Sequence, residues 1–211
     1  MLEFTLFKIP VRVEPVFWIT MGLLGFLSNQ GGGAGDAILL GALLFVVAGF
    51  ISLLIHEMGH ALMIQKYKLP TEIVLSSFGG YATHPAGILT RTQSFLVTLA
   101  GPLLQALFGA AVYFSIPYLD LPNSMIRDFV SYLWILSIFW AVLNCIPVLP
   151  MDGGRMLEAA LGPRRIKLTI TISMCVAIAA CVVGFSIGFH FLGIFMAMFA
   201  FQNYQMLERY K

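Results

Sequence analysis

One apolar stretch constrains the fold of this chain more than any other feature. Residues 37–67 read AILLGALLFVVAGFISLLIHEMGHALMIQKY, a run long enough for an α-helix to cross a bilayer. His56, Glu57 and His60 lie inside this run. Ionisable side chains at such depth are costly, so three of them so close together require an explanation. We therefore expect a membrane span that carries a polar site.

The spacing of these three side chains predicts a metal site. Residues i and i+4 of an α-helix share a face, so His56 and His60 can offer imidazole nitrogens to one ion, with Glu57 beside them. This H-E-x-x-H pattern is typical of zinc hydrolases, in which two histidines hold Zn²⁺ and the glutamate accepts a proton from the attacking water. The alternative is two helix-packing histidines with a chance glutamate between them, which an apolar span disfavours.

Composition decides between a soluble and a membrane protein. Hydrophobic residues make up 59% of the 211 residues, charged residues make up 10%, and the mean hydropathy is +0.90. These values exclude a soluble domain. The net charge of +2, without a Lys/Arg run, argues against nucleic-acid binding. We predict an all-α polytopic membrane protein with about six transmembrane helices, over residues 15–28, 37–66, 92–117, 127–148, 166–184 and 187–207.

The basic residues predict how the chain is oriented in the bilayer. If the N-terminus is cytoplasmic, eleven of the twelve lysines and arginines fall on the cytoplasmic side and only Arg127 falls outside. This asymmetry is what the positive-inside rule requires. Both termini of this multi-pass chain are therefore expected in the cytoplasm. The eleven residues are Lys8, Arg12, Lys66, Lys68, Arg91, Arg155, Arg164, Arg165, Lys167, Arg209 and Lys211.

Two short segments break the helical pattern. Residues 4–14 suit a short strand or an interfacial segment. Residues 72–78 are β-prone and are followed by Gly79 and Gly80, which predicts a small β-hairpin at the cytoplasmic face near the active site; an ordinary loop is the alternative. The exposed edge of such a hairpin could pair with an extended substrate strand.

A third zinc ligand is needed, and charge balance favours a carboxylate. Most acidic residues lie in loops or at the ends of spans. Asp152 lies in AVLNCIPVLPMDGGR, where two prolines end the helix and Gly153–Gly154 are expected to let the backbone turn sharply. Irregular backbone at membrane depth is tolerated where protein surrounds it, so we predict a re-entrant segment that brings Asp152 to the metal. The alternative is a helix-ending turn with a solvated aspartate.

Two other polar residue types lie in apolar surroundings. The Asn144 amide could hydrogen-bond a substrate backbone or stabilise the developing oxyanion, or it could satisfy a neighbouring helix. The cysteines Cys145, Cys175 and Cys181 are odd in number and lie in apolar stretches, which argues against a disulfide framework. We expect buried free thiols.

These motifs resemble the site-2 protease family of intramembrane zinc metalloproteases, peptidase family M50. The similarity covers about residues 5–165 and extends to the compact six-span subgroup that includes SpoIVFB of bacilli. Gln105 stands where the family commonly has asparagine, so the resemblance assigns it no catalytic role. The motifs that carry the resemblance are His56–His60, Asn144–Gly154, Ala100–Pro102 and Phe78–Gly80.

The resemblance implies one Zn²⁺ per chain and cleavage in or near a transmembrane segment of a membrane-anchored protein substrate. It implies Glu57 as the catalytic residue, His56, His60 and Asp152 as metal ligands, and a prokaryotic cell membrane as the location. Residues 1–211 are expected to form a single domain without a PDZ or CBS module. The oligomeric state stays open. The alternatives are a metal transporter, which would need ligands in the outer half of the spans, and a non-catalytic scaffold, which would not need an intact motif.

Overall fold

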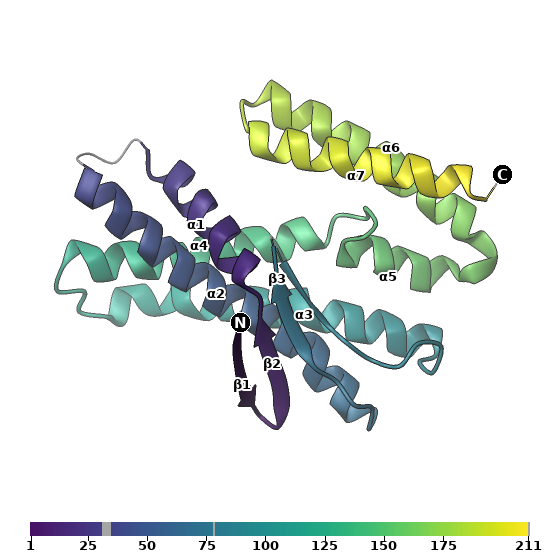
Figure 1. Ribbon diagram of the computed structural model, residues 1–211, viewed down its shortest axis with the longest axis horizontal. Coiled ribbons are helices and arrows are strands. Elements are labelled where there is room, and N and C mark those ends of the chain that lie inside the picture. The colour runs from purple at the N-terminus through teal and green to yellow at the C-terminus, as the bar shows by residue number, and fades with distance from the viewer. Residues whose placement is uncertain (31–34, 78, 211) are drawn as a thin grey trace. The chain divides into compact units, whose positions relative to one another are not determined.

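The computed structural model describes residues 1–30, 35–77 and 79–210 (Figure 1). It is mostly helical, as predicted, and it contains one small sheet. The chain divides into two compact units, one formed by residues 1–86 and 100–142 and the other by residues 87–99 and 143–211. Phe78, the last residue of the predicted β-prone stretch, lies outside the described residues. The expected single domain stays a prediction.

The first unit contains a four-stranded sheet with the order β1-β2-β3-β4. The strand pairs β1–β2 and β3–β4 are antiparallel hairpins, and β2 pairs with β3 in parallel. The predicted hairpin after residue 70 is therefore confirmed, and the N-terminal segment completes its sheet. The strands are β1 (Leu2–Leu6), β2 (Ile9–Val13), β3 (Ile73–Ser76) and β4 (Gly79–Ala82).

Alternation of side chains explains why β2 lies inside this sheet. Ile9, Val11 and Val13 are at most 1% exposed, while the residues between them are exposed or half-buried. Successive strand residues point to opposite faces, so one face of β2 is apolar and buried. In the neighbouring strand β3, Ile73 and Leu75 are fully buried. Strand β3 contacts α1 (Pro15–Ser28) and α2 (Gly35–Lys66), and β4 contacts α2.

The helices of the first unit approach one another at small residues. These helices are α1, α2, α3 (Arg91–Ser115) from residue 100 onward, the short η1 (Ile116–Tyr118), and α4 (Ser124–Asn144) up to residue 142. A Cβ atom built on Gly25 of α1 would lie 2.8 Å from the carbonyl oxygen of Ala42 on α2. Small residues let helix backbones pack this closely, as is common among membrane helices.

The second unit is built around a helical hairpin. Helices α6 (Ile166–Ser186) and α7 (His190–Glu208) lie side by side in Figure 1. A Cβ atom on Gly184 would lie 2.7 Å from the backbone nitrogen of Gly193, so these glycines allow the close approach. The unit also contains the start of α3, the short amphipathic helix α5 (Asp152–Leu161), and η2 (Pro163–Arg165).

Each predicted span coincides with a helix, although fewer helices meet a strict length and hydropathy requirement. Four segments among the described residues are long and apolar enough to cross a membrane. Helix α1 is apolar but has 14 residues, fewer than a perpendicular span needs. The six-span count stays a prediction. The four segments are Gly35–Lys66, Arg91–Tyr118, Ser124–Asn144 and Pro163–Ser186.

Candidate active site

The candidate site begins on α2, which buries three ionisable side chains. His56, Glu57 and His60 are 4%, 3% and 8% exposed. Because residues i and i+4 share a helix face, the two histidines come together, and Glu57 projects beside them. The helix around them is apolar enough to cross a bilayer. Three ionisable side chains are thus buried within a segment whose other residues suit a lipid environment.

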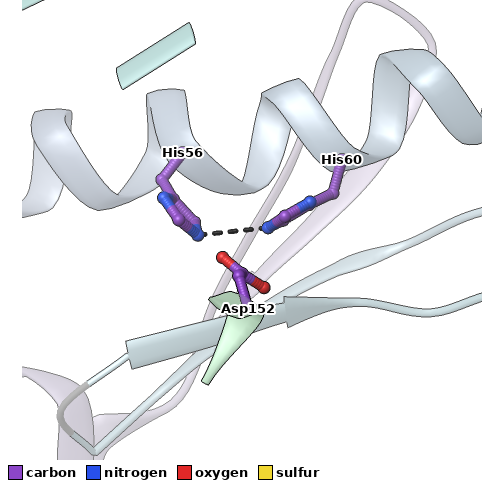
Figure 2. A group of neighbouring side chains, drawn as sticks. All are labelled: His56, His60 and Asp152. Carbon is purple, nitrogen blue, oxygen red and sulfur yellow. Dashed lines mark hydrogen bonds between the residues drawn. The ribbon is translucent and has the colours of Figure 1, made fainter. Parts of the chain in front are cut away.

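The two imidazole rings are arranged like a pair of metal ligands. Their Nε2 atoms are 3.1 Å apart, and Figure 2 shows these nitrogens facing each other from successive turns of α2. Two nitrogen ligands at about 2.0–2.1 Å from a tetrahedral zinc ion stand about 3.3 Å apart. The observed separation therefore fits two histidine ligands of one Zn²⁺.

Gln105 of α3 holds the other side of the His56 ring. Its Oε1 lies 2.9 Å from His56 Nδ1, and its Nε2 donates to Ser52 Oγ at 2.8 Å. Because the amide nitrogen is engaged with Ser52, the amide oxygen faces the ring as an acceptor, and Nδ1–H is assigned as the donor. No role for Gln105 was predicted from the sequence. The signal that could have marked it is an amide within an apolar span, and the structure shows that this amide is fully buried.

His60 packs against the backbone of α3 at a glycine. A Cβ atom on Gly101 would lie 2.2 Å from His60 Nε2. The backbone of α2 next to His60 also packs closely against α3, because a Cβ on Gly59 would lie 2.3 Å from the carbonyl oxygen of Ala100. The Ala-Gly-Pro motif of α3 therefore provides the space that the His60 ring occupies. This physical function could not be read from the motif alone.

Glu57 lies against the edge strand of the sheet. A Cβ atom on Gly80 of β4 would lie 2.9 Å from Glu57 Cγ and 3.0 Å from Glu57 Oε1. A residue with a side chain at position 80 would therefore displace the Glu57 carboxylate or the strand. Gly79, the other glycine of the predicted pair, has open space where its Cβ would be. The structure thus distinguishes two glycines that the sequence could not.

Asp152 belongs to the second unit, where it is half-buried and is the first residue of α5. The positive end of a helix dipole favours a carboxylate at this position. The expected sharp turn at Gly153–Gly154 was wrong, because both glycines lie in the first turn of α5. A Cβ on Gly153 would lie 2.2 Å from Ile146 O, and one on Gly154 would lie 2.4 Å from Leu149 N. The glycines therefore serve close packing of α5 on the preceding loop.

Hydrogen bonds hold both ends of the segment that carries Asp152. The buried amide of Asn203 on α7 donates from Nδ2 to Leu149 O at 2.7 Å. At the other end of α5, the Arg91 guanidinium donates to the carbonyl oxygens of Ala159, at 2.9 Å, and Ala160. Neither of these contacts was predicted from the sequence, because each joins residues that are distant in the chain.

The other residues that the sequence singled out have simpler surroundings. Asn144 is the last residue of α4 and is half-buried. The three cysteines are free, as predicted, but Cys145 and Cys175 are exposed, so their expected burial was wrong. Cys175 lies in the apolar segment Pro163–Ser186, and Cys145 directly follows the apolar segment Ser124–Asn144.

Sequence comparisons identify related proteins. A family model described as Peptidase family M50 matches residues 115–187, which include Asp152 but not the H-E-x-x-H motif. A zinc metalloprotease of Methanocaldococcus jannaschii is 27% identical over 162 residues, covering 76% of this chain and 45% of that protein. Stage IV sporulation protein FB of Bacillus subtilis is 26% identical over 221 residues, covering 95% of this chain and 71% of that protein. The chain thus spans less than half of the archaeal relative.

A solved structure shares the fold. The site-2 protease from Methanocaldococcus jannaschii matches with a TM-score of 0.66 and 22% sequence identity, over 98% of this chain and 94% of that one. At this identity the likeness shows the fold alone. The family model, the relatives and the two motifs agree with one another. The chain is therefore similar to peptidase family M50, through the family model over residues 115–187 and through relatives that align with most of its length.

Proposed function

We propose that the chain is an intramembrane zinc metalloendopeptidase, which hydrolyses peptide bonds in or near transmembrane segments of membrane-anchored proteins. The observation that carries this proposal is the pair of His56 and His60 Nε2 atoms, 3.1 Å apart and buried beside Glu57 in an apolar helix. Two ligands and a proton acceptor are thus held within one short stretch of α2. The proposed form is one domain over residues 1–211 with one Zn²⁺ per chain.

The proposed ligands are His56, His60 and Asp152, which Figure 2 labels. The first unit supplies the two histidines and the second unit supplies the aspartate. Two neutral imidazoles and a carboxylate are a ligand set that suits Zn²⁺ and leaves a position open. When bound, the ion supplies Lewis-acid polarisation of the scissile carbonyl and of a water molecule.

Glu57 is the proposed general base and general acid. Its carboxylate accepts a proton from the water that attacks the peptide carbonyl, and it returns that proton to the leaving amine nitrogen. Its burial at 3% exposed shields this exchange from bulk water. Gly80 leaves the carboxylate the space it occupies.

The proposed substrate contacts are Gly79, Gly80 and Asn144. Strand β4 ends the strand order of the described sheet, so its outer edge can accept a further strand. An extended peptide added to β4 would pass beside Glu57, because Gly80 lies against that side chain. A substrate helix must unwind locally before this pairing, since its carbonyl oxygens are hydrogen-bonded within the helix.

The proposed topology places six spans in a prokaryotic cell membrane with both termini in the cytoplasm. Four segments that are long and apolar enough, together with the uneven distribution of basic residues, support it. Single-cysteine variants at Lys8 and Arg127, in a cysteine-free background, test the orientation with an impermeant thiol reagent on sealed vesicles. Labelling of both positions from the same side would contradict it.

Cleavage of a single-span substrate by purified Glu57→Gln protein tests the function. We expect a loss of about 10²–10⁴-fold in rate with the zinc content unchanged, because only the proton acceptor is removed. Retained cleavage would exclude the proposed role of Glu57. Asp152→Asn is expected to weaken zinc binding instead. Zinc flux into proteoliposomes, without cleavage, would favour a transporter.

A further inference from the structure

A buried chain of polar side chains runs behind His56 and links three helices. It consists of His56 and Ser52 on α2, Gln105 on α3 and Ser137 on α4. Gln105 and Ser137 are 0% exposed, and Ser52 is 1% exposed. Each of these helices is a candidate membrane span. Polar groups at such depth are costly unless they are hydrogen-bonded, so the arrangement calls for a function.

The hydrogen bonds of this chain have a defined direction. Ser137 Oγ donates to Ser52 Oγ at 3.0 Å. Gln105 Nε2 donates to Ser52 Oγ at 2.8 Å and to the Ser52 carbonyl oxygen at 3.3 Å. With its nitrogen used in this way, Gln105 presents its oxygen to His56 Nδ1 at 2.9 Å. An amide oxygen can only accept, so the ring proton of His56 is placed on Nδ1.

The position of Ser52 explains why Gln105 is well oriented. Ser52 and His56 lie four residues apart on α2 and share one face of the helix. Gln105 therefore bridges two successive turns of α2, with its nitrogen on one turn and its oxygen on the next. Reversal of the amide would place an N–H group against the His56 Nδ1–H and an oxygen against the Ser52 carbonyl. The two serines thus select one orientation of the amide.

We propose that Gln105 is a positioning residue for the metal site: it fixes the tautomer and the ring orientation of His56, so that the Nε2 lone pair faces the metal. Ser52 and Ser137 act through Gln105. This inference rests on the proposed function, because it takes His56 as a zinc ligand. Partners of this kind raise metal affinity by orienting the ligand, and their loss typically weakens metal binding about 10–100-fold.

Zinc affinity of the purified full chain, measured by competition with a chelator, tests the proposal. Gln105→Met keeps the side chain's length but removes all three hydrogen bonds of the amide, and we expect its zinc Kd to rise about 10–100-fold. Gln105→Glu keeps an acceptor for His56 Nδ1–H and gives up the donor to Ser52. Its Kd is expected to stay within about threefold of the wild-type value, because the His56 tautomer is preserved.

Tyr132→Phe is the matched control for a lost hydrogen bond in the same unit. Its hydroxyl donates to Asn29 Oδ1 at 2.6 Å. We expect this variant to lose thermal stability without a change in zinc Kd. A purely structural Gln105 would behave like Tyr132, so an unchanged Kd in Gln105→Met would overturn the proposal.

The same experiment separates failure of the inference from failure of the proposed function. If wild-type protein binds no zinc, or if His56→Ala binds it equally well, the proposed function fails and the inference falls with it. If wild-type protein binds one zinc ion and Gln105→Met binds it as tightly, the inference alone fails. Should Gln105→Met not fold, Gln105→Glu still decides, because a large loss of zinc affinity in that variant contradicts an acceptor role.

Discussion

Gly80 of β4 lies so close to Glu57 of α2 that a Cβ atom at position 80 would stand 2.9 Å from Glu57 Cγ. This contact joins the proposed proton acceptor to the strand on which a substrate would pair. The preceding glycine, Gly79, has nothing within 4 Å of its Cβ position. A methyl group added at position 80 would therefore clash with Glu57, whereas one added at position 79 would meet open space.

Gly80→Ala is expected to lower proteolytic activity strongly and to leave zinc content unchanged. The added methyl group must displace Glu57 or β4, and a misplacement of about 1 Å at a reacting group costs on the order of 100-fold in rate. Gly79→Ala is the control, and we expect its activity to be close to that of the wild type. Cleavage of a single-span substrate measures both. Equal activity of the two variants would show that Glu57 tolerates the displacement.

Gly101→Ala is expected to weaken zinc binding by at least tenfold and to destabilise the protein by about 1–3 kcal/mol. The new Cβ would lie 2.2 Å from His60 Nε2, so the ring must leave its position. Gly22→Ala on α1 is the control, because nothing lies within 4 Å of its Cβ position. Thermal unfolding and chelator competition measure the two effects. A normal zinc Kd in Gly101→Ala would mean that His60 is not a ligand.

Asn203→Leu is expected to destabilise the protein by about 1–3 kcal/mol, because the buried carbonyl oxygen of Leu149 loses its donor. Since this donor holds the loop before Asp152, a weaker zinc affinity is expected as well. Gln205→Leu on the same helix is exposed and serves as the control. Thermal melting of the detergent-solubilised chain measures the loss. Equal melting temperatures for the two variants would refute the structural role of Asn203.

Removal of zinc is expected to lower the melting temperature of the wild-type chain. A ligand that binds only the folded state at 100 times its Kd stabilises that state by about 2.7 kcal/mol. His56→Ala should melt at the same temperature with and without zinc, because it lacks a ligand. A zinc-dependent shift of wild-type size in His56→Ala would place the metal elsewhere.

Local patterns predicted much of this structure. The apolar runs located the helices, and the i, i+4 spacing of His56 and His60 predicted their shared face, because both signals depend on neighbouring residues. The hairpin after residue 70 was also accessible from its β-prone residues and its glycines. The parallel pairing of Val11 with Ile73 was not, because it joins segments about 60 residues apart.

The contacts that adjust the site were beyond a reading of the sequence. Gln105 reaches His56 across 49 positions, and its importance depends on an amide orientation that Ser52 selects. Gly153–Gly154 looked like a turn, since glycine permits one, but the pair instead removes side chains where α5 meets the preceding loop. In a sequence, a glycine pair is compatible with either a turn or close packing, and only the three-dimensional structure distinguishes the two.

The strand order also guides where probes can be attached. The strand order is β1-β2-β3-β4, so β1 and β4 are the two edge strands and lie on opposite sides of the sheet. Neighbouring strands lie about 4.8 Å apart, so β1 and β4 are roughly 14 Å apart. A fluorophore attached at the exposed position 3 of β1, in place of Glu3, would therefore not block the outer edge of β4, where a peptide would bind. It could report on peptide docking by energy transfer without obstructing it.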